Sequence, residues 1–305
     1  MSAPAKADQA TQHPNPAGMS IGMVALLAAA LAMSISPTFV RLADVGPYAS
    51  AFWRVFFGLP VLWVWMKREE ASNPDAPAAR FPVGTLLAAV AFTGDLFFWH
   101  LAIMKTSIAN ATFFATMAPL WVVIFGWLIL RQKVSRETIV GLALCILGGA
   151  ALVAQSLAFN PAHALGDLFG IATGVFFGLY FLCVGSARTS SGAARVTFEL
   201  SVLTTIALLA IAFFMEPRIL PQSTGGWAAV IALGVVSHAG GQGLLSFALG
   251  RLPTAFSSLV IFLEAIAAAI FAWIILGEPI SWMQAVGGVI ILWGIWYARP
   301  RKTAE

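Results

Sequence analysis

The sequence predicts an all-α integral membrane protein in which ten transmembrane helices form two inverted five-helix repeats around a central cavity. Three observations support this fold class. Of the 305 residues, 60% are hydrophobic and only 10% are charged, and the mean hydropathy is +0.88. The apolar residues also fall into ten long runs, and the fourth and fifth runs resemble the ninth and tenth. Soluble domains carry about 25% charged residues, so the composition excludes a soluble enzyme, a disordered chain and a disulfide scaffold.

Each apolar run has roughly the length of a transmembrane helix, which needs about 20 residues. The predicted runs are 20–40, 47–66, 81–104, 107–130, 136–157, 165–186, 195–215, 225–248, 254–276 and 281–298. The strands of porin-type barrels alternate between apolar and polar residues over about 10 residues, whereas the runs here are continuously apolar over about 20, so a barrel is not expected. The domain prediction is a disordered cytoplasmic tail, two repeats and a second cytoplasmic tail, with the bounds 1–18, 19–158, 164–298 and 299–305.

Basic residues predict the orientation of the chain in the membrane. Most Lys and Arg residues occur in alternate segments between the runs, such as those that hold Lys67, Arg131 and Arg195. Cytoplasmic loops are enriched in Lys and Arg. We therefore expect a multi-pass protein of the bacterial inner membrane with both termini in the cytoplasm, which requires an even number of helices.

An internal repeat becomes visible when the chain is compared with itself at an offset of 146 residues. The matched pairs are Ala109 with Ala255, Trp127 with Trp273, Leu130 with Leu276, Ser135 with Ser281, Gly141 with Gly287 and Gly148 with Gly294. Because five is an odd number, two halves of five helices must cross the membrane in opposite directions. Inverted repeats are typical of secondary transporters that bind their substrate near the membrane midplane.

Two stretches carry a resemblance to a known family. The segment from Ala109-Asn110-Ala111 to Trp127-Leu128-Ile129-Leu130, and its counterpart from Leu263-Glu264-Ala265 to Gly277-Glu278, resemble the EamA-type repeat of the drug/metabolite transporter superfamily. The resemblance covers residues 20–298. It implies ten helices in two inverted halves around a central cavity, and relatives that include amino-acid exporters of the YddG-like type. Arg131-Gln132 replaces the usual Gly-Glu, and Ala265 replaces a frequent Pro, which weakens any subfamily assignment.

Polar residues within the apolar runs are the candidates for the cavity. A charged group at the centre of a bilayer costs about 2.5–3.5 kcal/mol on translocon scales, so such residues usually face a cavity or a partner. The candidate substrate-cavity residues are Asp95, Trp99, His100, Asn110, Tyr180, His238, Gln242 and Glu264. Asp95, His100 and Glu264 are also candidate proton sites, because carboxyl and imidazole groups can titrate there. The alternative is that each group simply bonds a neighbouring helix.

Breaks in helical regularity supply candidate hinges. Pro37 and Pro119 can kink their helices, although static bends are an equal alternative. Gly240 and Gly241 can unwind a helix locally, but close helix packing is the favoured interpretation for these two glycines. Arg54 is interpreted as a locally paired or snorkelling residue, with the attraction of a substrate carboxylate as the alternative.

These features together predict a secondary transporter that exports small organic metabolites, amino acids first, by alternating access. An uptake or exchange carrier for a nucleotide-linked or vitamin-like solute is the second possibility. A non-transporting membrane receptor and an intramembrane enzyme are alternatives of another class. The sequence shows no P-loop, zinc motif or catalytic motif, and Cys145 and Cys183 belong to no metal motif. We therefore expect no catalytic residues, no metal, no cofactor and no nucleic-acid partner, only a small-molecule solute and the lipid bilayer, with a monomer sufficient.

Overall fold

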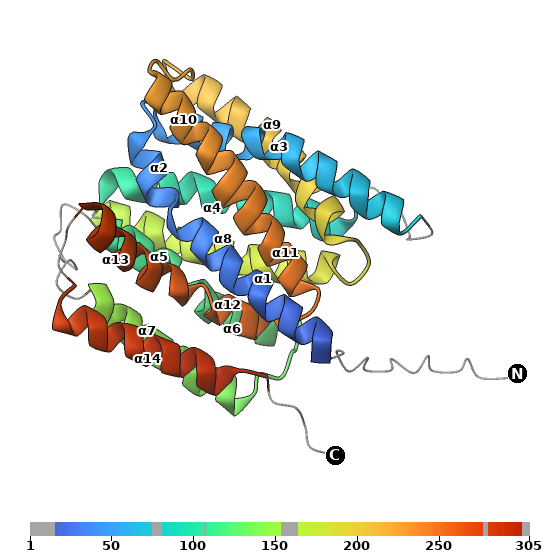
Figure 1. The fold of residues 1–305 in the computed structure, drawn as a ribbon, viewed down its shortest axis with the longest axis vertical. Helices are drawn as coiled ribbons and strands as arrows, with labels where there is room; N and C mark the ends of the chain where they lie inside the picture. Colours follow the sequence, from blue (N-terminus) through green and yellow to red (C-terminus); the bar gives the residue numbers. More distant parts are fainter. Residues whose placement is uncertain (1–15, 75–80, 107, 154–163, 277–279, 301–305) are drawn as a thin grey trace, which may run out of the picture.

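All regular elements in the described part of the chain are helices, which confirms the all-α class (Figure 1). The computed structural model describes residues 16–74, 81–106, 108–153, 164–276 and 280–300. The first half contains α1 (Pro16–Ser34), α2 (Ser36–Leu42), α3 (Pro47–Ser72), α4 (Val83–Lys105), α5 (Ile108–Ala115), α6 (Ala118–Leu128) and α7 (Arg136–Val153). The second half contains α8 (Ala164–Ala187), α9 (Ala193–Met215), α10 (Thr224–Ala232), the π-helix η2 (Leu233–Gln242), α11 (Gly243–Leu249), α12 (Thr254–Leu259), α13 (Phe262–Leu276) and α14 (Trp282–Ala298).

The helices form a bundle suited to a lipid environment. Eight segments of the described chain are long and apolar enough to cross a membrane: Gly18–Val40, Pro47–Ser72, Val83–Lys105, Asn110–Leu128, Ala164–Ala187, Ala193–Met215, Thr224–Leu249 and Thr254–Phe271. Trp282–Ala298 is a shorter apolar helix. Large apolar side chains also cover the outside of the bundle, since Val24, Val90 and Phe214 are 68%, 66% and 81% exposed. Such a surface is compatible with lipid and not with water.

Three of the predicted continuous runs are interrupted. The run 20–40 breaks at Ile35, and the run 107–130 breaks between Ala115 and Ala118. Pro37 and Pro119 follow these breaks within the first turn of the next helix, because a proline ring clashes with the carbonyl group four residues earlier. The run 254–276 breaks between α12 and α13 although it has no proline.

The N-terminal boundary and the eighth run also differ from the predictions. Helix α1 begins at Pro16, inside the predicted tail, because proline suits the first turn of a helix. The predicted run 225–248 contains the π-helix η2 at its centre. The i→i+5 hydrogen bonds of a π-helix widen the turn and change which side chains share a face.

Helices α7 and α14 show the inverted repeat directly. A Cβ atom on Gly141 would lie 2.7 Å from the carbonyl oxygen of Gly294, and a Cβ atom on Gly148 would lie 2.6 Å from that of Gly287. At the offset of 146 residues, Gly141 is equivalent to Gly287 and Gly148 to Gly294. The contacts are therefore reciprocal, as at an isologous two-fold interface, and the two equivalent helices run antiparallel.

Helices α3 and α9 are a second equivalent pair, and each caps the other. The Glu216 carboxylate, at the C-terminal end of α9, accepts hydrogen bonds from the backbone N–H groups of Tyr48 (2.6 Å) and Ala49 (3.2 Å) at the start of α3. The Glu69 carboxylate, near the end of α3, accepts one from the N–H group of Arg195 at the start of α9 (3.2 Å). The first N–H groups of a helix lack intrahelical partners and favour negative charge, so both ends of the α3–α9 pair are fixed.

Candidate functional site

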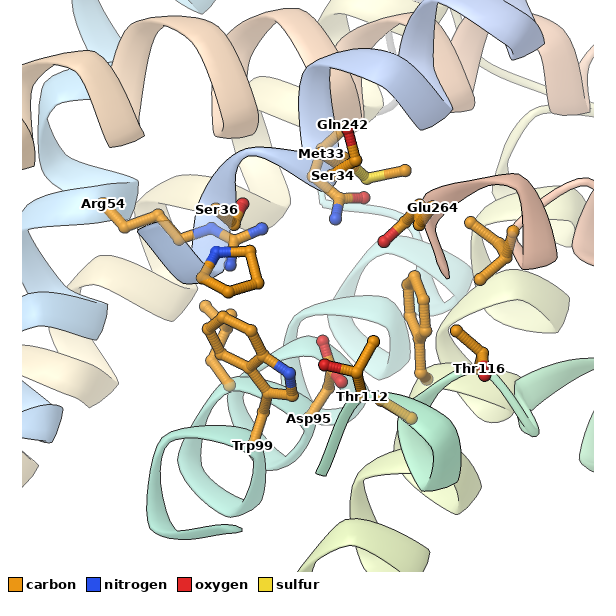
Figure 2. A pocket seen from close by; sticks show the side chains of 15 residues that line it. Met33, Ser34, Ser36, Arg54, Asp95, Trp99, Thr112, Thr116, Gln242 and Glu264 are labelled. Carbon is orange, nitrogen blue, oxygen red and sulfur yellow. The ribbon is translucent and has the colours of Figure 1, made fainter. Parts of the chain in front are cut away.

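A pocket between the two halves brings together side chains from α1, α2, α3, α4, α5, α8, η2 and α13 (Figure 2). Three helix interruptions border it. Ser36 and Pro37 follow the α1–α2 break, Thr116 lies in the α5–α6 break, and Ile261 lies in the α12–α13 break. Interrupted helices leave backbone groups free for binding and are characteristic of transporter substrate sites. The interruptions therefore coincide with the candidate site.

Three charged side chains line this pocket. Arg54 of α3 is 5% exposed and Asp95 of α4 is 7% exposed, and Glu264 stands in the first turn of α13. The Arg54 guanidinium lies 5.7 Å from the ring centroid of Trp99, a cation–π distance. Arg54 also interacts electrostatically with both carboxyl groups, but in the described chain no ion pair within 4 Å joins these three side chains. Figure 2 shows the carboxyl groups of Asp95 and Glu264 pointing into the space between them.

Several polar atoms of the lining lack a partner. Ser36 Oγ, Arg54 Nε, Gln242 Oε1 and Glu264 Oε1 are buried and have no hydrogen-bond partner among the described residues. A buried unsatisfied polar group costs about 1–3 kcal/mol, and buried polar groups in proteins are rarely left without a partner. The convergence of four such atoms on one pocket indicates a site that is built to hold water or a polar solute.

The pocket is small in this conformation. A volume of about 60 Å³ is open to the centres of water molecules. One water needs about 10–15 Å³ by this measure, so only a few waters fit. A solute larger than a few water molecules requires the surrounding helices to move apart.

The structure brings four of the eight predicted cavity residues to this pocket. Asp95, Trp99, Gln242 and Glu264 line it, together with the hinge candidate Pro37. The other four are described at positions outside the lining: His100, Asn110, Tyr180 and His238.

The two histidines have local partners. His238 Nε2 lies 2.8 Å from Ser201 Oγ, and the imidazole stacks on Phe92 with ring centroids 5.5 Å apart. His100 Nδ1 lies 2.7 Å from the carbonyl oxygen of Leu96 in its own helix. Both His238 and Gln242 lie in the π-helix η2, but the structure brings only Gln242 to the pocket lining.

Asn110 and Tyr180 also make contacts away from the lining. Asn110 Nδ2 donates a hydrogen bond to Asp167 Oδ1 at 2.9 Å, which ties α5 to α8. Tyr180 packs against Phe92 with ring centroids 4.9 Å apart and against Phe177 at 5.9 Å. Its ring thus supports Phe177, which does line the pocket.

The remaining hinge candidates differ in their surroundings. Pro119 lies in the first turn of α6 and outside the lining. A Cβ atom on Gly241 would lie 2.4 Å from Met33 Cγ, whereas one on Gly240 would meet only the Val235 carbonyl oxygen at 3.5 Å. Gly241 is thus a packing position, and Gly240 has room for a side chain.

Arg54 is the main functional candidate that the favoured sequence interpretation missed. The sequence signal was a single charged residue inside an apolar run, and only the less favoured interpretation assigned Arg54 to the binding of a substrate carboxylate. Ser36, Thr112 and Thr116 also line the pocket. Ser and Thr are common packing residues in membrane helices, so the presence of these three residues in the sequence does not indicate a site.

Comparison with known proteins is consistent with this architecture. The model of the EamA-like transporter family matches residues 20–154 and 164–299, one match for each half. An uncharacterized transporter from Archaeoglobus fulgidus is 26% identical over 279 residues, which cover 91% of this chain and 96% of the relative. The pseudopaline exporter CntI from Pseudomonas aeruginosa is 22% identical over 194 residues, which cover 64% of this chain and 66% of the exporter.

A solved crystal structure shares the fold. It superposes with a TM-score of 0.77 at 17% identity and covers 92% of this chain and 98% of the other chain. At this level of identity the similarity concerns the fold alone.

Proposed function

Because the chain belongs to the EamA-like transporter family, we propose that it is a secondary transporter that exports small organic metabolites, amino acids first, by alternating access. The observation that carries this proposal is the pocket between two inverted halves, in which Arg54, Gln242 and Glu264 present unsatisfied polar atoms. A site that has both a guanidinium and carboxyl groups suits a solute that has both an acidic and a basic group.

The proposed topology has ten spans with both termini in the cytoplasm of a bacterium. Helices α7 and α14 are shorter than most of the other spans, but their glycine contacts pair them as equivalent antiparallel helices, which supports a fifth span in each half. Helix α1 begins and α14 ends at the same end of the bundle (Figure 1). Basic residues also gather there: a Cβ atom on Gly22 of α1 would lie 3.0 Å from Arg251 Cβ, and Arg195 pairs with Glu70 at the end of α3. This distribution supports a cytoplasmic face at that end.

The proposed solute contacts are Arg54, Asp95, Trp99, Gln242 and Glu264. Asp95 and Glu264 are the proposed proton sites, because both are carboxyl groups within the pocket lining. His100 is a weaker candidate, since its Nδ1 atom is engaged by the carbonyl group of its own helix. The proposed hinges are Pro37 and Gly240. Pro37 lines the pocket in the first turn of α2, and Gly240 lies in the π-helix with room for a side chain.

The direction of transport is proposed from one relative. The Pseudomonas aeruginosa relative is named as an exporter, whereas the Archaeoglobus fulgidus relative is named only as a transporter. The charges disfavour the second candidate, a carrier of nucleotide-linked solutes. Phosphate groups are bound by several cations, and this lining offers one guanidinium against two carboxyl groups.

Flux through purified protein in liposomes tests the proposal. A panel of radiolabelled solutes, covering neutral, acidic and basic amino acids and a nucleotide sugar, should show saturable flux for an amino-acid class. Asp95→Asn and Glu264→Gln should reduce the stimulation by a pH gradient, whereas Glu70→Gln at the surface should retain it. Absence of saturable flux for every amino acid would refute the proposed substrate class, and chemical turnover without flux would indicate an enzyme instead.

A further inference from the structure

The charges of the pocket constrain which solute it can neutralise. Arginine keeps its proton in proteins, so Arg54 contributes a fixed positive charge. Asp95 and Glu264 contribute up to two negative charges. A buried site that carries net charge is costly, and such sites tend towards neutrality. The empty pocket is therefore neutral when one of the two carboxyl groups holds a proton and the other balances Arg54.

The net charge of the bound solute then determines whether the protonated carboxyl group of the pocket keeps its proton. A zwitterion adds one positive and one negative charge, so the pocket stays neutral with its proton in place. A solute with one carboxylate and two cationic nitrogens adds a net positive charge. The pocket remains neutral only if the second carboxyl group loses its proton. Each net positive charge on the solute thus displaces one proton.

Resting on the proposed transport function, we propose that the solute class is a cationic amphoteric metabolite, with one carboxylate held by Arg54 and two cationic nitrogens held by Asp95 and Glu264, exchanged for one proton. The Arg54 guanidinium can bind a carboxylate with two parallel hydrogen bonds, and its Nε atom is free in the described structure. Asp95 and Glu264 come from α4 and α13, so two separate nitrogens can be reached from opposite walls (Figure 2).

The other lining groups fit such a solute. Trp99 lies beside Arg54 and offers an aromatic face to a cation or to an aliphatic chain. Gln242 Oε1 is buried, without a partner among the described residues, and can accept a hydrogen bond from an ammonium group. Gln242 Oε1 thus adds one acceptor to those of the two carboxyl groups, as cationic nitrogens require.

Three further titratable groups are coupled to Arg54 and belong in the charge balance. They are Tyr180 on α8, His100 on α4 and His238 on η2. All three are buried and lie outside the lining. His238 is engaged with Ser201, and His100 with a carbonyl group. Burial favours the neutral form of all three groups, so the exchangeable proton belongs to Asp95 or Glu264.

Three solutes that differ by one group each test the inference on the wild-type protein. Lysine has one carboxylate and two cationic nitrogens, norleucine lacks the side-chain amine, and 1,5-diaminopentane lacks the carboxylate. With a pH dye inside the liposomes, lysine flux should move about one proton in the opposite direction per lysine, and norleucine flux should move none. Diaminopentane should compete with labelled lysine at least roughly tenfold less well than unlabelled lysine. A membrane potential should leave lysine flux unchanged, because the exchange is electroneutral.

Variants assign the carboxylate contact and the cation contacts of the pocket. Arg54→Gln should remove the preference for lysine over diaminopentane, and Glu264→Gln should abolish the proton counterflow. If Arg54→Gln does not fold, Arg54→Lys keeps the charge but loses the planar fork, and it should narrow the same preference. Lysine flux that follows the membrane potential, equal proton counts for lysine and norleucine, or equal competition by diaminopentane would each overturn this inference. Those outcomes leave amino-acid transport intact, whereas failure of all amino acids would instead overturn the proposed function.

Discussion

Cys145 Sγ lies 3.7 Å from the carbonyl oxygen of Ile291, and these two residues are equivalent positions of the two halves. Their separation in the chain is 146 residues. Residues related by a two-fold axis meet each other only where the axis passes between them. The Cys145–Ile291 contact therefore places the pseudo-two-fold axis of the inverted repeat between α7 and α14.

The glycines beside this axis should tolerate no side chain. A Cβ atom on Gly148 would lie 2.6 Å from the carbonyl oxygen of Gly287, so Gly148→Ala forces the two backbones apart. Overpacking of this kind costs about 1–3 kcal/mol. Gly288→Ala is the matched control on α14, because its Cβ atom would meet only Ile266 Cγ1 at 4.0 Å. Thermal unfolding in detergent should show a lower midpoint for Gly148→Ala alone. Equal midpoints for the two variants would contradict the close approach.

The cap that Glu216 places on α3 should contribute to stability. Glu216→Ala removes the acceptor for two helix N-terminal N–H groups and should cost about 1 kcal/mol, as the loss of a helix cap does. Glu69→Ala should have a similar effect at the opposite membrane face. Glu216→Gln keeps an oxygen acceptor and should lose less than Glu216→Ala. The unfolding midpoints of the three variants in one detergent check the order.

The same carboxyl group should make stability depend on pH. Burial raises the pKa of Glu216 above its ordinary value of 4.5, although hydrogen bonds from the N–H groups of Tyr48 and Ala49 oppose the shift. The folded protein therefore keeps this proton to a higher pH than the unfolded chain does. The contribution of this proton to the free energy of unfolding is complete below pH 4.5 and is lost as the pH rises through the raised pKa of Glu216. The unfolding midpoint of the wild type minus that of Glu216→Gln should therefore decrease as the pH rises through the raised pKa. An increase of this difference would show that folding lowers the pKa of Glu216.

Particular elements show what the sequence could and could not predict. The offset of 146 residues matched Gly141 with Gly287 and Gly148 with Gly294, and the structure brings all four glycines to the contact between α7 and α14 in the crossed pairs Gly141–Gly294 and Gly148–Gly287. Pro37 and Pro119 predicted kinks, and the structure interrupts the helix just before each of these prolines. The α12–α13 break has no proline to signal it. The π-helix contains Gly240 and Gly241, for which local unwinding was the less favoured interpretation of the sequence.

The site was partly predictable for a related reason. Asp95, Gln242 and Glu264 stand out as polar residues within apolar runs, and the structure brings all three to one pocket. His100 and His238 stand out equally, yet each has a local partner. Polarity at membrane depth indicates that a residue has some partner, and only the fold decides whether the partner is a neighbouring helix or a cavity.

Gly240 offers a test of the proposed hinge in the π-helix. A methyl group fits at this position, since the nearest atom would lie at an ordinary 3.5 Å. Alanine stabilises helices by up to about 1 kcal/mol relative to glycine. Gly240→Ala should therefore keep or raise the unfolding midpoint while slowing transport. Flux and thermal unfolding measured on the same preparation check this pair of effects, and unchanged flux would mean that Gly240 is no hinge.

The buried carboxyl groups should lower the stability of the empty protein. Glu264 Oε1 has no partner among the described residues, and when both carboxyl groups ionise, the pocket keeps one negative charge that Arg54 does not balance, which is costly. Glu264→Gln keeps the shape and leaves Asp95 as the carboxylate that balances Arg54, so at alkaline pH it should raise the unfolding midpoint while reducing flux, as expected when function requires a destabilised site. Asp95→Asn should behave alike. A fall in both midpoints would indicate that the carboxylates have structural roles instead.

Access to the pocket from the two membrane faces tests the central claim most directly. Cysteine at Thr112, in the pocket lining, can be introduced into a Cys183→Ser background in which Cys145 is fully buried. Impermeant thiol reagents applied to oriented vesicles should label this cysteine from either face, with a solute gradient shifting labelling from one face to the other. A cysteine at Val90, 66% exposed on the outside of the bundle, should stay unlabelled in the bilayer. Labelling at position 112 that is confined to one face under all solute conditions, or absent from both, would contradict alternating access.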